Sequence, residues 1–121
     1  MIQTAIDAMA EAAAEALEGT GVPIITDPAE VIPALAADQI ILFIAPPTEI
    51  TPITYERRSY KFEPALISPN SEDAAGAVLA LGEILEDLDM DLEAETTTLE
   101  TLQIGAGPAW PAAIIHTTIT L

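Results

Sequence analysis

The stretch ITYERRSYKFEPALIS, residues 53–68, contains the pattern that decides the fold of this chain. Its side chains alternate between apolar and polar, which predicts a β-strand with one buried and one wet face. Tyr60, Phe62 and Leu66 fall on the buried face. Pro64 interrupts the alternation and lacks an amide hydrogen, so we expect an edge position, a bulge or a bend there. The wet face carries Arg57, Ser59, Lys61 and Glu63.

The residues before this strand predict a helix and two short strands. Apolar residues at helical spacing and a row of acids opposite them predict an amphipathic helix over residues 2–17. The apolar residues are Ile2, Ile6, Met9, Ala13 and Leu17, and the wet face has Gln3, Asp7, Glu11, Glu15 and Glu18. Residues 22–26 predict a short strand, and Asp27-Pro28 is typical of a helix start. Pro33 limits that helix to a turn or two. QIILFIA, residues 39–45, predicts a buried strand that ends at Pro46-Pro47.

The residues after it predict a second long helix over 72–88. Its first turn carries Glu72 and Asp73, and its buried stripe is Val78, Leu81, Leu85 and Leu88. The rest of the chain predicts an acidic turn over 89–95, a strand over 94–104, a loop over 105–111 and a strand over 112–121. This order predicts one α+β domain over residues 1–121, with an antiparallel or mixed sheet and two main amphipathic helices packed on one face.

Composition narrows the possible functions. The 121 residues are 50% hydrophobic, which excludes a disordered chain. A net charge of -17 with Lys+Arg 3 argues against a bound nucleic acid or anionic membrane. Cys is 0, so disulfides and thiolate metal sites are excluded. The first residues lack the basic start of a signal peptide, and residues 40–47, the longest apolar run, are too short to span a membrane. We expect a protein made in a cytoplasm, with no membrane contact.

The sequence contains no recognisable set of catalytic residues, so we expect that the protein is not an enzyme and binds no cofactor. His116 is the only histidine and has no nucleophile near it in sequence. Asp87, Asp89 and Asp91 have the spacing that opens a calcium loop, but the Gly and Glu that such a loop needs are Leu92 and Thr98 here. An adventitious calcium site and a solvated turn stay open. The glycines of Gly105-Ala106-Gly107 precede Pro and Trp rather than a helix, which excludes a phosphate-binding loop.

The charges are segregated along the chain. Arg57, Arg58 and Lys61 are the only basic residues. The acids from residue 72 to residue 100 have no basic residue among them. This polarity favours head-to-tail assembly, in which the basic spot of one copy meets the acidic surface of the next. The alternative is local neutralisation of acids such as Glu56 and Glu63. Trp110, between Pro108 and Pro111, is either an interface anchor or a cap on the core.

The overall layout resembles the tail terminator, or tail completion, proteins of long-tailed bacteriophages and related minor tail proteins. The resemblance covers nearly the full length and follows an amphipathic first helix. It is carried by QIILFIAPP (39–47), YERRSYKFEPALISP (55–69), NSEDAAGAVLALGEIL (70–85) and PAWPAAIIHTTITL (108–121). Pro64 and the low basic content depart from the usual pattern of that family.

The resemblance implies a structural virion protein at the head-proximal end of the tail. Tail terminators form a ring, usually a hexamer, that stops polymerisation of the tail tube and receives the head-completion or connector protein. DNA passes through the ring as cargo. The implied partners are further copies, the tail tube protein and the head-completion protein.

The charge pattern then assigns roles to particular residues. We expect Arg57, Arg58, Lys61 and Trp110 at the interface between copies. Glu83, Glu86 and Asp87 are our candidates for lining the channel, because an acidic wall leaves DNA free to slide. The alternative for these three acids is that they keep a crowded assembly soluble.

Three other functions stay open on the sequence. The chain could be another neck, head-closure or minor tail protein of the same fold. It could be a small ligand-binding or hydrolytic domain, although the sequence nominates no pocket with convergent polar groups. It could also be an acidic DNA mimic that occupies a basic partner, which the net charge of -17 permits.

Overall fold

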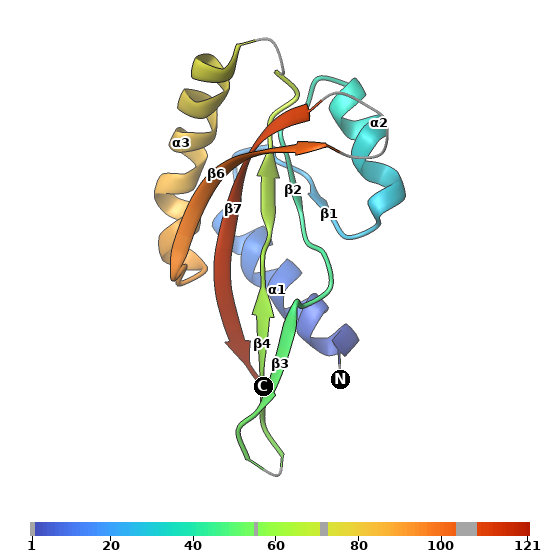
Figure 1. The fold of residues 1–121 in the computed structure, drawn as a ribbon, viewed down its shortest axis with the longest axis vertical. Coiled ribbons are helices and arrows are strands. Elements are labelled where there is room, and N and C mark those ends of the chain that lie inside the picture. Colours follow the sequence, from blue (N-terminus) through green and yellow to red (C-terminus); the bar gives the residue numbers. More distant parts are fainter. Residues whose placement is uncertain (1, 55, 71–72, 104–108) are drawn as a thin grey trace.

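The structure, a computed structural model, describes residues 2–54, 56–70, 73–103 and 109–121. Within these residues it has three α-helices and a 7-stranded mixed sheet, which confirms the predicted α+β class. The helices are α1 (Ile2–Ala16), α2 (Val31–Ala36) and α3 (Ala74–Asp91), and a 3-10 turn, η1 (Pro28–Glu30), leads into α2. The strands are β1 (Ile24–Ile25), β2 (Ile41–Phe43), β3 (Glu49–Pro52), β4 (Arg58–Phe62), β5 (Ala65–Ile67), β6 (Thr96–Gln103) and β7 (Ala109–Thr120) (Figure 1).

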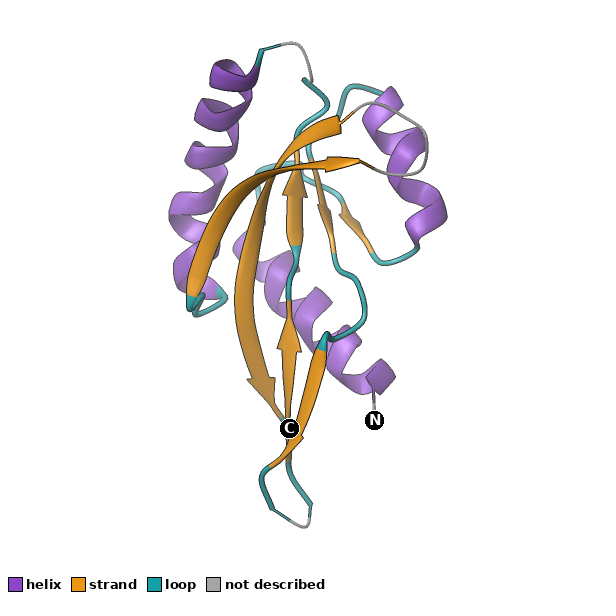
Figure 2. Ribbon diagram, in the orientation of Figure 1, coloured by secondary structure: helices purple, strands orange, loops and turns teal. Residues whose placement is uncertain are grey.

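The long strand β7 organises the sheet. On one side it pairs with β5 and then with β4, and on the other side it pairs with β6 along its first eight residues. β2 extends the sheet beyond β5, and β3 extends it beyond β4. These pairs are antiparallel, whereas β1 runs parallel to β2. β6 therefore lies at one edge of the sheet, and β1 and β3 lie at the other (Figure 2).

Pro64 separates β4 from β5 without changing their register against β7. Phe62 stands opposite Thr117, and Ala65 stands opposite Ile114, so each strand has the same number of residues between these pairs. The Pro64 carbonyl accepts a hydrogen bond of 2.9 Å from the Ile115 amide. The predicted edge position and bulge are wrong. Pro64 interrupts a central strand and removes one donor from its ladder while the pairing continues.

α1 and α3 pack on one face of the sheet, as the sequence predicts. Phe62 and Leu66 from the sheet meet Met9, Leu81 and Leu88 from these helices in one buried cluster. α1 buries Ala5, Met9 and Ala13, whereas Ile2 is 48% exposed, so its predicted place in the buried stripe is wrong. Small residues on the inner side of α1 allow its backbone to lie close to its neighbours. The predicted wet face of α1 is exposed throughout.

The buried stripe of α3 differs from the predicted one at its first turn. The stripe is Ala77, Leu81, Leu85, Leu88 and then Leu92 just after the helix. Val78 follows Ala77 and is turned away from the buried stripe toward the β6 edge. The sheet no longer covers it there, so it is 40% exposed. Asp73 caps the helix by accepting from the Gly76 amide at 3.0 Å. The helix continues to Asp91, so the acidic turn predicted from residue 89 begins too early.

The opposite face of the sheet holds a second apolar cluster that the sequence did not predict. α2 covers part of this face and contributes Val31 and Leu35. The sheet contributes Ile41, Ile67 and Ile114; the register sets Ile41 opposite Ile67 and Ile114 opposite Ala65 on the same face. The cap predicted at Asp27 is confirmed, because its side chain accepts from the Ala29 amide at 3.0 Å.

Two substitutions on α3 test this arrangement. Leu81→Ala should cost about 2–5 kcal/mol in the free energy of unfolding, because Leu81 is fully buried and a cavity would remain. Val78→Ala should cost well under half as much, since its side chain already contacts water. Urea unfolding followed by circular dichroism measures both. Equal losses would contradict the corrected stripe.

Candidate functional site

The β3–β4 hairpin projects from the body of the molecule. Arg58 and Leu121 form the last backbone pair between β4 and the end of the chain, with hydrogen bonds of 3.0 Å in both directions. Residues 53, 54, 56 and 57 therefore lie beyond this last pair (Figure 1). The turn is closed by the Ile53 amide, which donates to the Arg57 carbonyl at 3.0 Å. Ile53 is 53% exposed, so the hairpin end presents an apolar as well as a cationic surface.

All three cations of the chain lie on this hairpin. Arg57 lies in the turn, Arg58 shares the sheet face of Tyr60, and Lys61 lies on the opposite face beside Glu49 of β3. Within the described part of the chain, none of the three comes within ion-pair distance of a carboxylate. The described residues therefore include no ion pair from these cations to Glu56 or Glu63, the acids named in the alternative of local neutralisation.

Glu63 instead pairs with His116 on the face that α2 partly covers. The Glu63 Oε1 atom lies 3.1 Å from His116 Nδ1, and the two side chains are 37% and 22% exposed, respectively. His116 Nε2 lies 3.4 Å from the Thr98 hydroxyl, which donates to Glu100 Oε2 at 3.1 Å. The four side chains form a row across β4, β7 and β6.

Three members of this row, Glu63, His116 and Glu100, line a hollow on the sheet face that α2 partly covers. The hollow has a volume of about 440 Å³ and an apolar lining of Phe43, Ala45, Ala65, Leu102 and Ile114. Glu63, Glu100 and His116 supply its polar groups. Its two carboxylates outnumber its single imidazole, so the hollow is anionic whether or not His116 carries a charge. The arrangement suits a ligand with an apolar body and a cationic end.

Nothing in the sequence points directly to this hollow. Glu63, Thr98 and His116 are far apart along the chain and meet only through the pairing of β7 with its neighbours. The only signal in the sequence was the alternation of side chains along a strand, which puts Thr98 and Glu100 on one face of β6 and puts Glu63 on one face of its own strand. That signal needs the strand register before it identifies a site.

Trp110 lies in β7 rather than in a loop, because the strand begins at Ala109. Its ring is partly buried against the cluster that contains α2, opposite Leu102 of β6. The indole Nε1 atom is buried and has no hydrogen-bond partner among the described residues. This placement fits the core-cap alternative, and the exposed part of the ring is what an interface would use.

Two of the three acids proposed to line a channel, Glu83 and Glu86, lie on the outer side of α3. Glu83 and Glu86 are exposed, and the side chain of Asp87 lies outside what the structure describes. Leu79 and Met90 continue the same helical row and are 73% and 78% exposed. The outer row of α3 thus has two acids flanked by apolar ends. The motif of Asp87, Asp89 and Asp91 belongs to α3 rather than to a loop, which does not fit the calcium-loop alternative.

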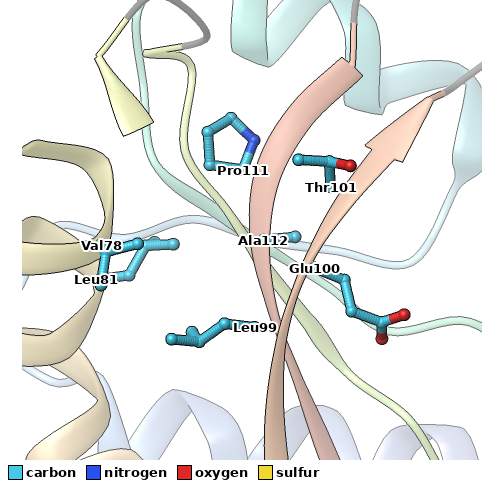
Figure 3. A pocket seen from close by; sticks show the side chains of 7 residues that line it. All are labelled: Val78, Leu81, Leu99, Glu100, Thr101, Pro111 and Ala112. Carbon is cyan, nitrogen blue, oxygen red and sulfur yellow. The ribbon is translucent and has the colours of Figure 1, made fainter. Parts of the chain in front are cut away.

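A second, smaller hollow lies between α3 and β6. It measures about 260 Å³, and its lining is Val78, Leu81, Leu99, Glu100, Thr101, Pro111 and Ala112. Figure 3 shows Leu99 directed toward α3 and Glu100 directed to the other side of β6. The hollow is apolar and lies beside the edge strand, so it extends the exposed surface that β6 offers.

The described residues offer neither a metal site nor a membrane-spanning helix. They include no cluster of three metal-binding side chains, and no helix among them is both long and apolar enough to cross a membrane. Gly105 to Gly107 lie outside the described residues. No protein-family model matches the chain, and no curated protein matches its sequence.

Proposed function

We propose that this chain is a structural virion protein that forms a ring on the tail tube of a long-tailed bacteriophage. The ring stops tube polymerisation, receives the head-completion protein and lets DNA pass. The proposal rests on the resemblance in layout, which an α+β fold with two long helices on one sheet face supports.

The separation of charge carries the assembly part of the proposal. The three cations lie on a projecting hairpin and make no ion pair in the described residues, while partly or fully exposed acids lie elsewhere on the surface, Glu63 and Glu100 among them. A contact between unlike surfaces of identical copies is head-to-tail, and it closes into a ring when the rotation between copies is right. The same charges steer copies into the correct orientation as they meet.

The edge strand β6 gives a second reason to expect a neighbour. It has eight residues, and Thr98, Leu99, Glu100 and Thr101 are all exposed. Long exposed edge strands promote uncontrolled pairing unless another element covers them. A neighbouring copy on this edge would cover it.

Light scattering on the purified chain tests the assembly step. We expect either a ring-sized particle or a monomer that assembles only when tail tubes are added. Electron microscopy of particles that lack the protein should then show tubes of uncontrolled length.

Other outcomes would identify the alternatives. A protein that stays monomeric with tail tubes contradicts the proposal. Normal tube length in particles that lack the protein would favour a neck or head-closure protein of the same fold. A monomer that retains DNA-binding proteins would favour the DNA mimic.

A further inference from the structure

We infer that the anionic hollow lined by Glu63, Glu100 and His116 receives the β3–β4 hairpin of a neighbouring copy. This inference rests on the proposed function, because it names the acceptor surface of the head-to-tail contact. The occupant is a second copy of this chain, and the donor atoms are the guanidinium groups of Arg57 and Arg58.

The chemistry of the hollow fits the end of the hairpin. The hairpin end presents the exposed apolar side chain of Ile53 beside two arginines. The hollow combines an apolar floor with the carboxylates of Glu63 and Glu100 at its rim. Guanidinium groups bind carboxylates through paired hydrogen bonds, which fix orientation as well as adding energy. A volume of about 440 Å³ is in the range of protein cavities that bury small ligands.

The hairpin arginines cannot fill the hollow of their own copy. Arg57 precedes Glu63 by six residues of nearly extended chain, which is roughly 20 Å. Arg58 lies two residues before Tyr60 in β4, so both side chains are on the same sheet face, which is opposite the hollow. The contact must therefore join different molecules.

The row from Glu63 to Glu100 keeps the hollow ready for a cation. His116 and Thr98 hold the two carboxylates by contacts of 3.1 Å each, so little side-chain freedom is left to lose on binding. Both acids remain partly or fully exposed and can accept further hydrogen bonds. The structure thus offers a preorganised acceptor whose charge is opposite to that of the hairpin.

Charge exchange between the two surfaces tests the inference. Variant one is Arg57→Glu with Arg58→Glu, and variant two is Glu63→Lys with Glu100→Lys. Each alone places like charges at every contact, so the ring should be lost in light scattering, with tail tubes added if the wild-type chain needs them. Mixing the variants pairs every hairpin with an opposite hollow, so alternating rings should return. A single chain with all four changes should also assemble.

Matched controls separate this contact from effects of net charge and folding. Glu11→Lys with Glu15→Lys changes the net charge as variant two does, but on the wet face of α1, and should leave the ring intact. Circular dichroism checks the fold of each variant. If Glu63→Lys does not fold, Glu100→Lys alone on the exposed edge strand should still weaken assembly, and variant one should rescue it.

The outcomes distinguish the inference from the proposed function. If the wild-type ring forms but variant two also forms it, the hollow is not the acceptor and only this inference fails. If variant two forms rings that no longer bind tail tubes, the hollow receives the tube protein and the inference is overturned. A wild-type chain that never assembles contradicts the proposed function itself.

Discussion

Phe62→Ala should destabilise the protein by about 3–5 kcal/mol, the largest loss that we expect from a single substitution. Phe62 has 0% of its surface exposed and lies in the cluster between the sheet and the helices α1 and α3. Domains of this size are stable by only about 5–15 kcal/mol, so the variant should lose a large share of its stability. Urea unfolding followed by circular dichroism measures the loss. The Arg57→Glu, Arg58→Glu background is suitable because association would otherwise add to the apparent stability.

Leu79→Ala is the matched control for this measurement. Leu79 is also a large apolar residue, but it is 73% exposed on the outer side of α3. Its truncation should change the free energy of unfolding by no more than about 0.5 kcal/mol. If Phe62→Ala cost no more than Leu79→Ala, the assignment of the core to the α1 and α3 face would be wrong.

Local periodicity was enough to predict the principal core face. Side chains in a strand alternate, so Tyr60, Phe62 and Leu66 had to share a face once a strand was assumed. The same reasoning on α3 predicted Leu81 and Leu85 correctly and failed at Val78. A helical stripe has a width that the sequence cannot define, because its limits depend on where the neighbouring sheet ends.

Long-range pairing explains what the sequence could not predict. The cluster under α2 exists because the pairing of β2, β5 and β7 places two rows on one sheet face, Ile41 with Ile67 and Ala112, and Phe43 with Ala65 and Ile114. Register between strands is a property of the folded chain, and an error of one residue would send each side chain to the other face. The contact between Glu63 and His116 depends on the same register.

For the three basic residues, the sequence shows that they are few and close together, and the structure shows where they lie. Arg57, Arg58 and Lys61 stand out in the sequence because the chain has no other cation. The expected single strand over 53–68 would have placed them within the sheet. In the structure a hydrogen bond from the Ile53 amide to the Arg57 carbonyl closes a hairpin end, so Arg57 projects beyond β7. Projection gives the cations access to another molecule.

Replacing Glu83, Glu86 and Asp87 together with lysine should impair DNA delivery while leaving tail length correct. Under the proposed function, DNA must move through the ring without binding to its wall. Each lysine at the wall would hold a phosphate by releasing condensed counterions, so the duplex would be retained. Tail length should not change, because the proposed contacts between copies use the hairpin and the hollow instead. Infectivity and electron microscopy of tails measure the two effects separately.

The charge-matched control is Asp7→Lys, Glu11→Lys and Glu15→Lys on α1. This triple makes the same change in net charge on a different exposed helix face. If the α3 acids line the channel, assembled rings of the α3 triple should bind DNA with a steeper dependence on salt than rings of the α1 triple, because more phosphates are neutralised. Equal effects of both triples would show that net charge alone matters and that these acids serve solubility. Normal infectivity of the α3 triple, with tails of correct length, would place the channel on another surface of the molecule.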